Sequence, residues 1–244
     1  MNIPQHIVLF PDGNRRWAKA RGIASFEGHQ QGYRKIIEFT GWCKNKGIKS
    51  IIAFGFSTEN WNRSEEEVNY LMMLLESGLL ESLERFKNEE VRVRVIGQRE
   101  RLPESLKKAI RIVEEETKNN EKINLNLAVS YGGKWDILQA INKIIEEKTR
   151  ALKELSARPS IEFINKFNAP VDENLFEKYL STAGLPNPDL IIRAGGEMRL
   201  SNFVLWQAAY SELYFSSKLW PDFTEEDLNT AINEFDKRVR RFGK

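Results

Sequence analysis

The chain has 244 residues, a length that suits one α/β domain with a sizeable core. Hydrophobic residues make up 41%, charged residues 30%, and the formal net charge is only +2. So small a charge does not indicate nucleic-acid binding. The single cysteine, Cys43, excludes an intrachain disulfide and a thiolate metal cluster. We expect a cytoplasmic protein, because we find neither a signal-peptide pattern nor an apolar run long enough to cross a membrane.

Short apolar runs alternate along the chain with longer amphipathic segments. The short runs predict strands at residues 6–10, 50–56, 91–97, 123–130 and 189–194, with 212–215 as a candidate sixth strand. The longer segments predict helices at residues 28–46, 64–88, 103–119, 135–157, 173–182 and 224–240. Ser64 with Glu67 has the pattern of a capping box, and Thr224 that of an N-cap.

This alternation predicts an α/β fold with a mostly parallel six-stranded sheet and helices on both faces. No linker or repeat divides the chain, so we interpret residues 1–244 as a single domain. Ligands of such folds bind outside the carboxyl ends of the strands. Polar segments that directly follow predicted strands are therefore the candidate sites.

The first candidate segment follows the first predicted strand and reads Asp12-Gly13-Asn14-Arg15-Arg16-Trp17. Gly lets the backbone turn sharply, and Arg presents a planar fork of donors that matches phosphate oxygens. Asp beside them could bind a Mg²⁺ ion that bridges those phosphates. An ordinary turn, in which Asp and Gly are common, is the alternative interpretation.

The second candidate segment follows the second predicted strand and contains Ser57, Thr58, Glu59, Asn60, Trp61 and Arg63. Several kinds of polar group lie here between a buried strand and the start of a helix. The alternative is a capping loop whose Trp covers the core.

The third candidate segment, residues 193–202, begins at the end of the strand predicted at 189–194. In it Arg193, Arg199, Leu200 and Ser201 flank a Gly-Gly pair, which makes a plausible diphosphate cradle. Glu212 follows in a stretch rich in aromatic residues, where a carboxylate needs a partner. That partner is either a bound cation or a neighbouring Lys or Arg.

Three segments that carry Arg, all at one predicted sheet edge, favour a diphosphate site over three coincidences. Neither GxxxxGK[ST] nor GxGxxG occurs, so the pattern is not that of a nucleotide site. His29, at a predicted helix start, would suit an anion, although a lone His is more often structural. The helix predicted at 64–88 has a wide apolar face, which fits either simple burial or the wall of a lipid-sized tunnel.

Long stretches of the sequence resemble the signature regions of the cis-prenyltransferases, the undecaprenyl diphosphate synthase family. In chain order they are HIVLFPDGNRRWAK, GHQQG, FSTENWNR, SYGGKWDI, IIRAGGEMRLSNFVLWQAAYSELYF, LWPDF and RRFG. The resemblance extends over residues 4–243. It implies a parallel-sheet fold and a homodimer.

The resemblance also implies an activity. Enzymes of this family condense isopentenyl diphosphate with an allylic prenyl diphosphate, here farnesyl or geranyl diphosphate, and depend on Mg²⁺. The product is a Z-polyprenyl diphosphate, such as the precursor of the undecaprenyl carrier lipid. A product of this kind would partition to the membrane surface, where we expect the enzyme as a peripheral protein.

The resemblance assigns roles to the candidate residues. Asp12 would bind Mg²⁺, Glu212 would complete the metal site, and Asn60 stands where the family assigns proton removal. The residues that would surround the allylic diphosphate are Gly13, Asn14, Arg15, Arg16, Trp17 and His29. Those that would shape the junction of the two substrates are Ser57, Thr58, Glu59, Trp61 and Arg63. Arg193, Arg199 and Ser201 would hold isopentenyl diphosphate, and the tail with Arg241 and Gly243 would reach the partner's site.

The sequence departs from the family pattern at Ser25, where many bacterial members have Arg, and Arg21 is a candidate replacement for that phosphate contact. Two other activities remain open on the same fold. A non-catalytic partner subunit is disfavoured because Asp12, Asn60 and Glu212 are all present. An irregular enzyme that couples two allylic diphosphates is disfavoured by Arg193, Arg199 and Ser201.

Overall fold

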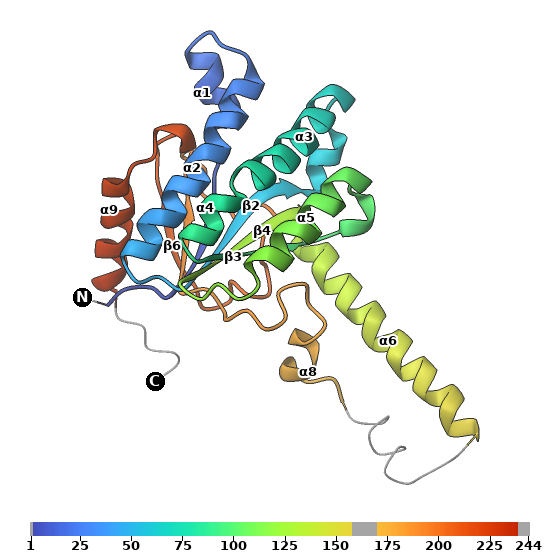
Figure 1. The fold of residues 1–244 in the computed structure, drawn as a ribbon. Helices are drawn as coiled ribbons and strands as arrows, with labels where there is room; N and C mark the ends of the chain where they lie inside the picture. The colour runs from blue at the N-terminus through green and yellow to red at the C-terminus, as the bar shows by residue number, and fades with distance from the viewer. Residues whose placement is uncertain (1, 158–169, 239–244) are drawn as a thin grey trace.

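The computed structural model describes residues 2–157 and 170–238, which fold around one sheet (Figure 1). Its strands are β1 (His6–Phe10), β2 (Ser50–Ser57), β3 (Val91–Ile96), β4 (Ile123–Tyr131), β5 (Leu190–Arg193) and β6 (Glu212–Phe215). Their order is β3-β4-β2-β1-β5-β6, and every neighbouring pair is parallel. The predicted strands and the predicted fold class are confirmed. All carboxyl ends of the strands therefore lie at one edge of the sheet.

The helices are α1 (Asn14–Ala20), α2 (Ser25–Asn45), α3 (Glu65–Glu81), α4 (Leu83–Asn88), α5 (Glu104–Thr117), α6 (Gly133–Ala157), α8 (Glu173–Glu177) and α9 (Glu225–Asp236). Short 3₁₀ turns occupy Thr58–Asn62, Arg99–Arg101 and Trp220–Asp222. The long helix α6 extends away from the rest of the molecule in Figure 1. None of the helices in the described ranges is long and apolar enough to span a membrane.

Successive residues of β1 point to opposite faces of the sheet, and each face has its own core. Ile7 and Leu9 belong to a large cluster that includes residues of four helices: Ile36, Leu71, Ile110 and Leu228. Val8 and Phe10 pack in a smaller cluster on the other face, with Phe203, Val204 and Trp135. Helices thus cover the first face. The second is covered largely by the turns at residues 201–210 and the first turn of α6.

Several helix boundaries differ from the sequence-based prediction. The predicted helix 64–88 is interrupted at Ser82, which ends α3 and begins α4. Helix α2 begins at Ser25 rather than at residue 28, so His29 lies in its second turn and not at its N-terminus. The predicted helices 173–182 and 224–240 are described only as Glu173–Glu177 and Glu225–Asp236.

Helix α1 was not predicted, because Asp12-Gly13 reads as a turn. Gly13 does turn the chain, with φ 105° in the left-handed region, and α1 starts at the next residue. A Cβ added to Gly13 would lie 2.8 Å from Cδ2 of Leu219, so both the dihedral and the close approach require glycine. This turn brings α1 over the end of β1.

We expect Gly13→Ala to lower the free energy of unfolding by about 1–3 kcal/mol, because alanine is strained at this φ and its methyl group meets Leu219. Urea unfolding would measure the loss. The control is Gly22→Ala, because Gly22 also has a positive φ, 67°, but nothing lies within 4 Å of the added Cβ. An equal loss in both variants would show that the contact with Leu219 does not matter.

Candidate active site

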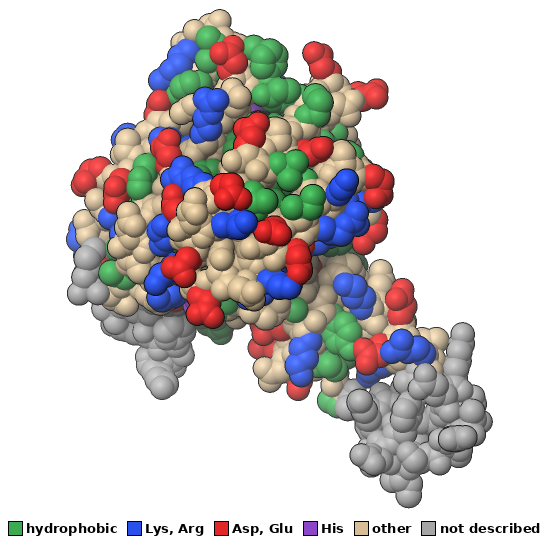
Figure 2. Space-filling view, viewed as in Figure 1, with side chains coloured by type: hydrophobic (Ala, Val, Ile, Leu, Met, Phe, Trp, Pro, Cys, Tyr) green, Lys and Arg blue, Asp and Glu red, His purple; other side chains and the backbone are tan. Residues whose placement is uncertain are grey.

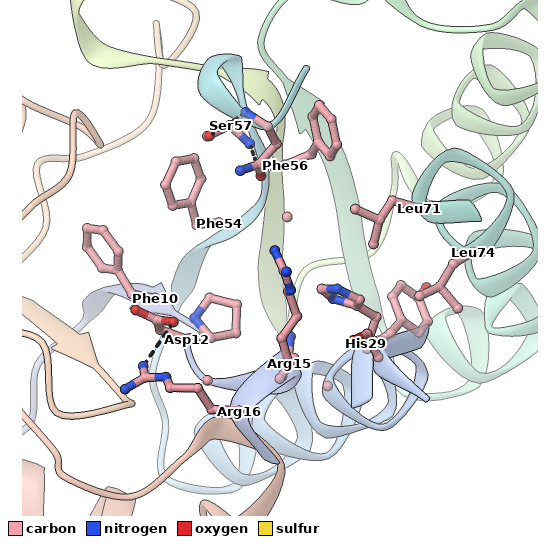
Figure 3. A pocket seen from close by; sticks show the side chains of 18 of the residues that line it. Phe10, Asp12, Arg15, Arg16, His29, Phe54, Phe56, Ser57, Leu71 and Leu74 are labelled. Carbon is pink, nitrogen blue, oxygen red and sulfur yellow. Dashed lines mark hydrogen bonds and ion pairs between the residues drawn. The ribbon is translucent and has the colours of Figure 1, made fainter. Parts of the chain in front are cut away.

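A cavity of about 1190 Å³ lies at the carboxyl ends of β1, β2 and β5 (Figure 3). All three candidate segments contribute to it. The predicted site residues among its lining are Asp12, Gly13, Asn14, Arg15, Arg16, His29, Ser57, Glu59, Asn60, Arg63, Arg193 and Ser201. The expectation that the three segments meet at one sheet edge is confirmed.

Asp12 lies between two arginines at the polar end of the cavity. Its Oδ2 accepts a hydrogen bond of 2.8 Å from Nη2 of Arg193, and its Oδ1 accepts one of 3.3 Å from Nη2 of Arg16. The Arg193 side chain is only 6% exposed, whereas that of Asp12 is 34% exposed. A buried guanidinium needs a counter-charge, and Asp12 supplies it while its carboxylate remains accessible from the cavity.

The Arg193 guanidinium is fixed by further contacts. Nη1 donates a hydrogen bond of 2.8 Å to Oγ of Ser201 and another to the carbonyl oxygen of Arg199, while the group lies 5.0 Å from the ring centre of Phe10. Its Nε is buried and has no hydrogen-bond partner in the described part of the chain. An unpaired buried donor is costly, so the guanidinium keeps one hydrogen-bonding position that the described residues leave unsatisfied.

Asn14 occupies a slot between α1 and α2 that depends on two glycines. A Cβ at Gly28 would lie 2.2 Å from the carbonyl oxygen of Asn14, and one at Gly32 would lie 2.5 Å from its Oδ1. That Oδ1 is buried and accepts no hydrogen bond from the residues described. Asn14 Oδ1 and Arg193 Nε are thus a buried acceptor and a buried donor that have no partner among the described residues.

Ser57 and Asn60 cap the turn that follows β2. The backbone N–H of Ser57 donates to Oδ1 of Asn60 at 3.0 Å, and the backbone N–H of Asn60 donates to Oγ of Ser57 at 3.2 Å. Because the amide oxygen of Asn60 is engaged in this cap, its NH₂ group is the part left for the cavity. Asn60 thus offers donors rather than a proton acceptor.

Glu59 is held by the third segment, because Asn202 donates a hydrogen bond of 2.7 Å to its Oε1. Burial alone would raise the pKa of Glu59, but hydrogen bonds from Asn202, Ser57 and Thr58 hold it below its usual value. Glu59 is therefore a carboxylate at neutral pH, and it links the second segment to the third.

One carboxylate, that of Glu67 on α3, organises three predicted site residues. It lies 2.9 Å from Nη1 of Arg63, 3.5 Å from Nε2 of His29 and 3.7 Å from Nη1 of Arg15. Ser64 accepts a hydrogen bond from the Glu67 backbone N–H, so the predicted cap forms, but the Glu67 side chain is directed to the cations instead. No local pattern in the sequence indicates this second role of Glu67.

His29 is neutral at physiological pH. Burial is the main cause that lowers its pKa below 6.5, and the nearby Arg63 lowers it further, while Glu67 opposes both. In Figure 3 the imidazole and Arg15 lie side by side over the cavity. A bound anion would favour the imidazolium form.

Another part of the cavity wall is apolar. It includes side chains from β2, α2 and α3: Phe54, Ile36, Tyr33, Leu71, Leu74 and Leu75. A β-bulge in the pairing of β2 with β4 lies at Phe54–Phe56, and Gly55 within it lines the cavity. Bulges often occur beside active sites, where they redirect side chains.

Some predicted site residues lie away from the cavity lining. Trp17 and Arg21 both bind Asp222, through hydrogen bonds of 2.8 and 3.0 Å, and their side chains stack on each other at 4.2 Å. The structure thus does not support Arg21 as the replacement phosphate contact. Lys19, which the sequence analysis did not select, lines the cavity beside Ser25.

Trp61 and Thr58 have packing roles, so for them the capping-loop interpretation holds. Trp61 donates a hydrogen bond of 2.9 Å to Ser130 and packs against Phe56. Thr58 lies against Gly132, where an added Cβ would be 2.4 Å from its hydroxyl oxygen.

Arg199 and Leu200 also lie outside the cavity lining. The Arg199 side chain is 60% exposed and pairs with Glu197 at 2.6 Å, and Glu197 also lies 3.6 Å from Arg16. Leu200 packs against the smaller core cluster. Within the third segment, only Arg193 and Ser201 of the predicted contacts reach the cavity.

Glu212 is not brought together with Asp12. It begins β6 and pairs in register with Leu190, the first residue of β5, whereas Asp12 follows the opposite ends of these strands. Three residues of strand, roughly 10 Å, separate Glu212 from the Arg193 end of the sheet. Its carboxylate instead forms an ion pair of 2.7 Å with Arg238. The predicted metal pair of Asp12 and Glu212 within one chain is therefore not supported. Arg241 and Gly243 lie outside the described residues.

The sequence matches a known protein family over nearly its whole length. Residues 10–243 match the family described as "Putative undecaprenyl diphosphate synthase". The chain belongs to this family. It is 46% identical over 243 residues to an isoprenyl transferase of Thermotoga maritima, a match that covers 100% of this chain and 98% of the relative. It is 48% identical to a chloroplastic nerylneryl diphosphate synthase of Solanum lycopersicum, over 99% of this chain and 71% of the relative.

Solved structures of family members share the fold. A lavandulyl diphosphate synthase from Lavandula x intermedia, in complex with dimethylallyl diphosphate, superimposes with a TM-score of 0.89 at 37% identity, over 99% of both chains. A probable undecaprenyl diphosphate synthase from Campylobacter jejuni gives 0.79 at 33% identity, over 100% of both chains. The chain is thus an isoprenyl transferase, that is, a prenyltransferase enzyme.

The two histidines of the chain provide a test of the site's electrostatics. We expect the pKa of His29 to lie below 6.5 in the free protein and to rise when pyrophosphate is added, because negative charge stabilises the imidazolium. NMR titration of the ring protons would measure this. His6 is the internal control, because it starts β1 at the opposite edge of the sheet. A pKa of His29 that does not respond would place the anion elsewhere.

Proposed function

We propose that this prenyltransferase condenses isopentenyl diphosphate with an allylic prenyl diphosphate, such as farnesyl or geranyl diphosphate, to give a Z-polyprenyl diphosphate. The observation that carries the proposal is a single cavity with two contrasting parts. Asp12 lies among arginines at the polar part, and apolar side chains of α2 and α3 form the other wall. A prenyl diphosphate has the same division into a charged head and an apolar tail.

The polar part of the cavity suits Mg²⁺. This ion is usually bound by one or two carboxylates together with waters and substrate phosphates, rather than by an all-protein cage. Asp12 is an accessible carboxylate in the lining of this cavity. No cluster of three or more His, Cys, Asp or Glu occurs within residues 2–157 and 170–238, which agrees with a site that the substrate completes. When bound, Mg²⁺ would neutralise the leaving diphosphate.

Two groups of side chains would hold the two diphosphates. Arg15, Arg63 and His29, gathered by Glu67, would bind the allylic diphosphate, and Arg193 with Ser201 would bind that of isopentenyl diphosphate. Fixing both substrates in this way provides much of the rate enhancement by positioning alone.

In the reaction, the allylic C–O bond breaks and the diphosphate leaves with the electron pair. The alkene of isopentenyl diphosphate then forms the new C–C bond, and loss of one proton creates the new double bond. Asn60 contributes its NH₂ group as a donor that orients a substrate oxygen, because its Oδ1 is occupied by Ser57. The proton therefore passes to a diphosphate oxygen, and the apolar wall keeps water from the allylic cation.

Coupling of two allylic diphosphates is the second candidate activity. It is favoured by the likeness to lavandulyl diphosphate synthase and by the position of Arg199 outside the cavity. Arg193 with Ser201 supports ordinary elongation. Incubation with dimethylallyl diphosphate alone separates the two, because only a coupling enzyme forms a product without isopentenyl diphosphate.

We also propose a cytoplasmic homodimer that works at the membrane surface, where its product partitions. In that dimer the tail with Arg241 and Gly243 of each chain would close the site of its partner. These are inferences from the sequence, and native mass spectrometry together with a chain truncated after residue 240 would test them.

Asp12→Asn should abolish turnover while leaving the fold intact, because an amide is a poor ligand for Mg²⁺ but its oxygen can still accept the hydrogen bond from Arg193. Removal of divalent cations with EDTA should have the same effect on the wild type. Product formation from radiolabelled isopentenyl diphosphate and farnesyl diphosphate is the assay, and circular dichroism confirms folding. Turnover that persists in EDTA would exclude a required metal.

Arg193→Ala should raise the KM for isopentenyl diphosphate roughly tenfold to a hundredfold, because a charge-assisted contact contributes ~1.5–3 kcal/mol. The KM for the allylic substrate should change much less. Arg21→Ala is the control, since Arg21 pairs with Asp222 outside the cavity lining. Equal changes for both substrates would mean that Arg193 serves the allylic diphosphate or only the fold.

A further inference from the structure

Tyr33 of α2 forms part of a wall between two cavities. Its side chain lines the substrate cavity of about 1190 Å³ and also a second cavity of about 370 Å³ between α2 and α3. Leu74 of α3 lines both spaces as well. These two side chains, one from each helix, therefore separate the substrate cavity from the second cavity.

The Tyr33 ring is fixed in this position by a matching glycine on α3. A Cβ added at Gly78 would lie 2.5 Å from Cε1 and 2.6 Å from Cζ of Tyr33, so the ring packs directly onto the helix backbone. Burial raises the pKa of the Tyr33 hydroxyl, and the Ser82 side chain, where α3 ends, is a neighbouring hydrogen-bonding group that opposes this. Ser82 lines the second cavity, so the hydroxyl end of the ring lies on that side.

The position of Tyr33 along α2 places it beyond the diphosphate site. It lies one helical turn, about 6 Å, after His29 on the same face of the helix. Around it the lining changes from polar to apolar, with Ile36, Leu71 and Leu74. A prenyl tail whose diphosphate lies near His29 would thus extend toward the Tyr33 ring.

We propose that Tyr33 limits the length of the prenyl chain that the enzyme builds, by closing the gap between α2 and α3 in the wall of the substrate cavity. This rests on the proposed function. Without the ring, the second cavity would continue the path between α2 and α3 and enlarge the available space by roughly a third, from the two volumes of 1190 and 370 Å³. Gln30, Arg34 and Glu81 around the second cavity indicate that this path leads toward solvent.

The first experiment compares the chain lengths of products from farnesyl diphosphate and labelled isopentenyl diphosphate. Tyr33→Ala should shift the main product by at least one isoprene unit toward longer chains. Tyr33→Phe keeps the ring and should give the wild-type length. Phe26→Ala removes an aromatic ring from the same helix outside the cavity lining and should also leave product length unchanged. An unchanged length in Tyr33→Ala overturns the proposal.

The second experiment uses Gly78, whose added methyl group must displace the ring. Gly78→Ala should shorten the products, because the ring is pushed away from α3, and should lower the midpoint of urea unfolding. Neither effect should occur when Gly78→Ala is combined with Tyr33→Ala. If Gly78→Ala acts equally in both backgrounds, its effect does not pass through the ring, and the proposed contact is wrong.

A binding measurement separates this inference from the proposed reaction. Saturated alkyl diphosphates cannot form an allylic cation, so calorimetry with a series of increasing length reports only the space available. Each added methylene should tighten binding about fourfold until the chain reaches Tyr33, the fold-change that corresponds to about 0.8 kcal/mol. In Tyr33→Ala the gain should continue to longer chains. A wild type that binds the series but makes no product would contradict the proposed function alone. The same cut-off in both proteins would contradict the role of Tyr33.

Discussion

The site depends on one ion pair between adjacent strands. Parallel pairing puts Arg193, the last residue of β5, beside Phe10 of β1, and Asp12 follows two residues later. The buried guanidinium and the more exposed carboxylate meet at 2.8 Å. Each neutralises the other before substrates arrive, so binding exchanges one set of counter-charges for another. The surrounding cations, gathered by Glu67, are held in the same manner.

The parts of the structure that could be predicted from sequence are those set by local pattern. Apolar runs of strand length marked all six strands, and their parallel arrangement brought three polar segments to one edge. Asp12, Arg193 and Ser201 were found in this way because each belongs to a polar segment at the carboxyl end of a strand. Glu212 shows where this inference from strand ends fails. It starts β6 instead of following it, so the parallel topology places it at the amino-terminal edge of the sheet, beside Arg238.

What the sequence could not reveal are contacts between side chains of different helices. Glu67 had the pattern of a helix cap, and nothing local to it indicated that Arg15 and His29 lie near its carboxylate. Lys19 belongs to a helix hidden by the turn-like Asp12-Gly13. Tyr33 and Gly78 are 45 positions apart in the sequence. Their contact depends on how closely α2 and α3 approach each other, which no local pattern reveals.

The glycine slot of α2 has a mechanical consequence. Asn14 packs so closely against Gly28 and Gly32 that a side chain at either position would clash with it, which holds α1 against α2. These two helices carry Arg15 and His29 at one point and Tyr33 a turn further along. A lengthening tail that pressed on Tyr33 would therefore act on the same pair of helices that holds the leaving group.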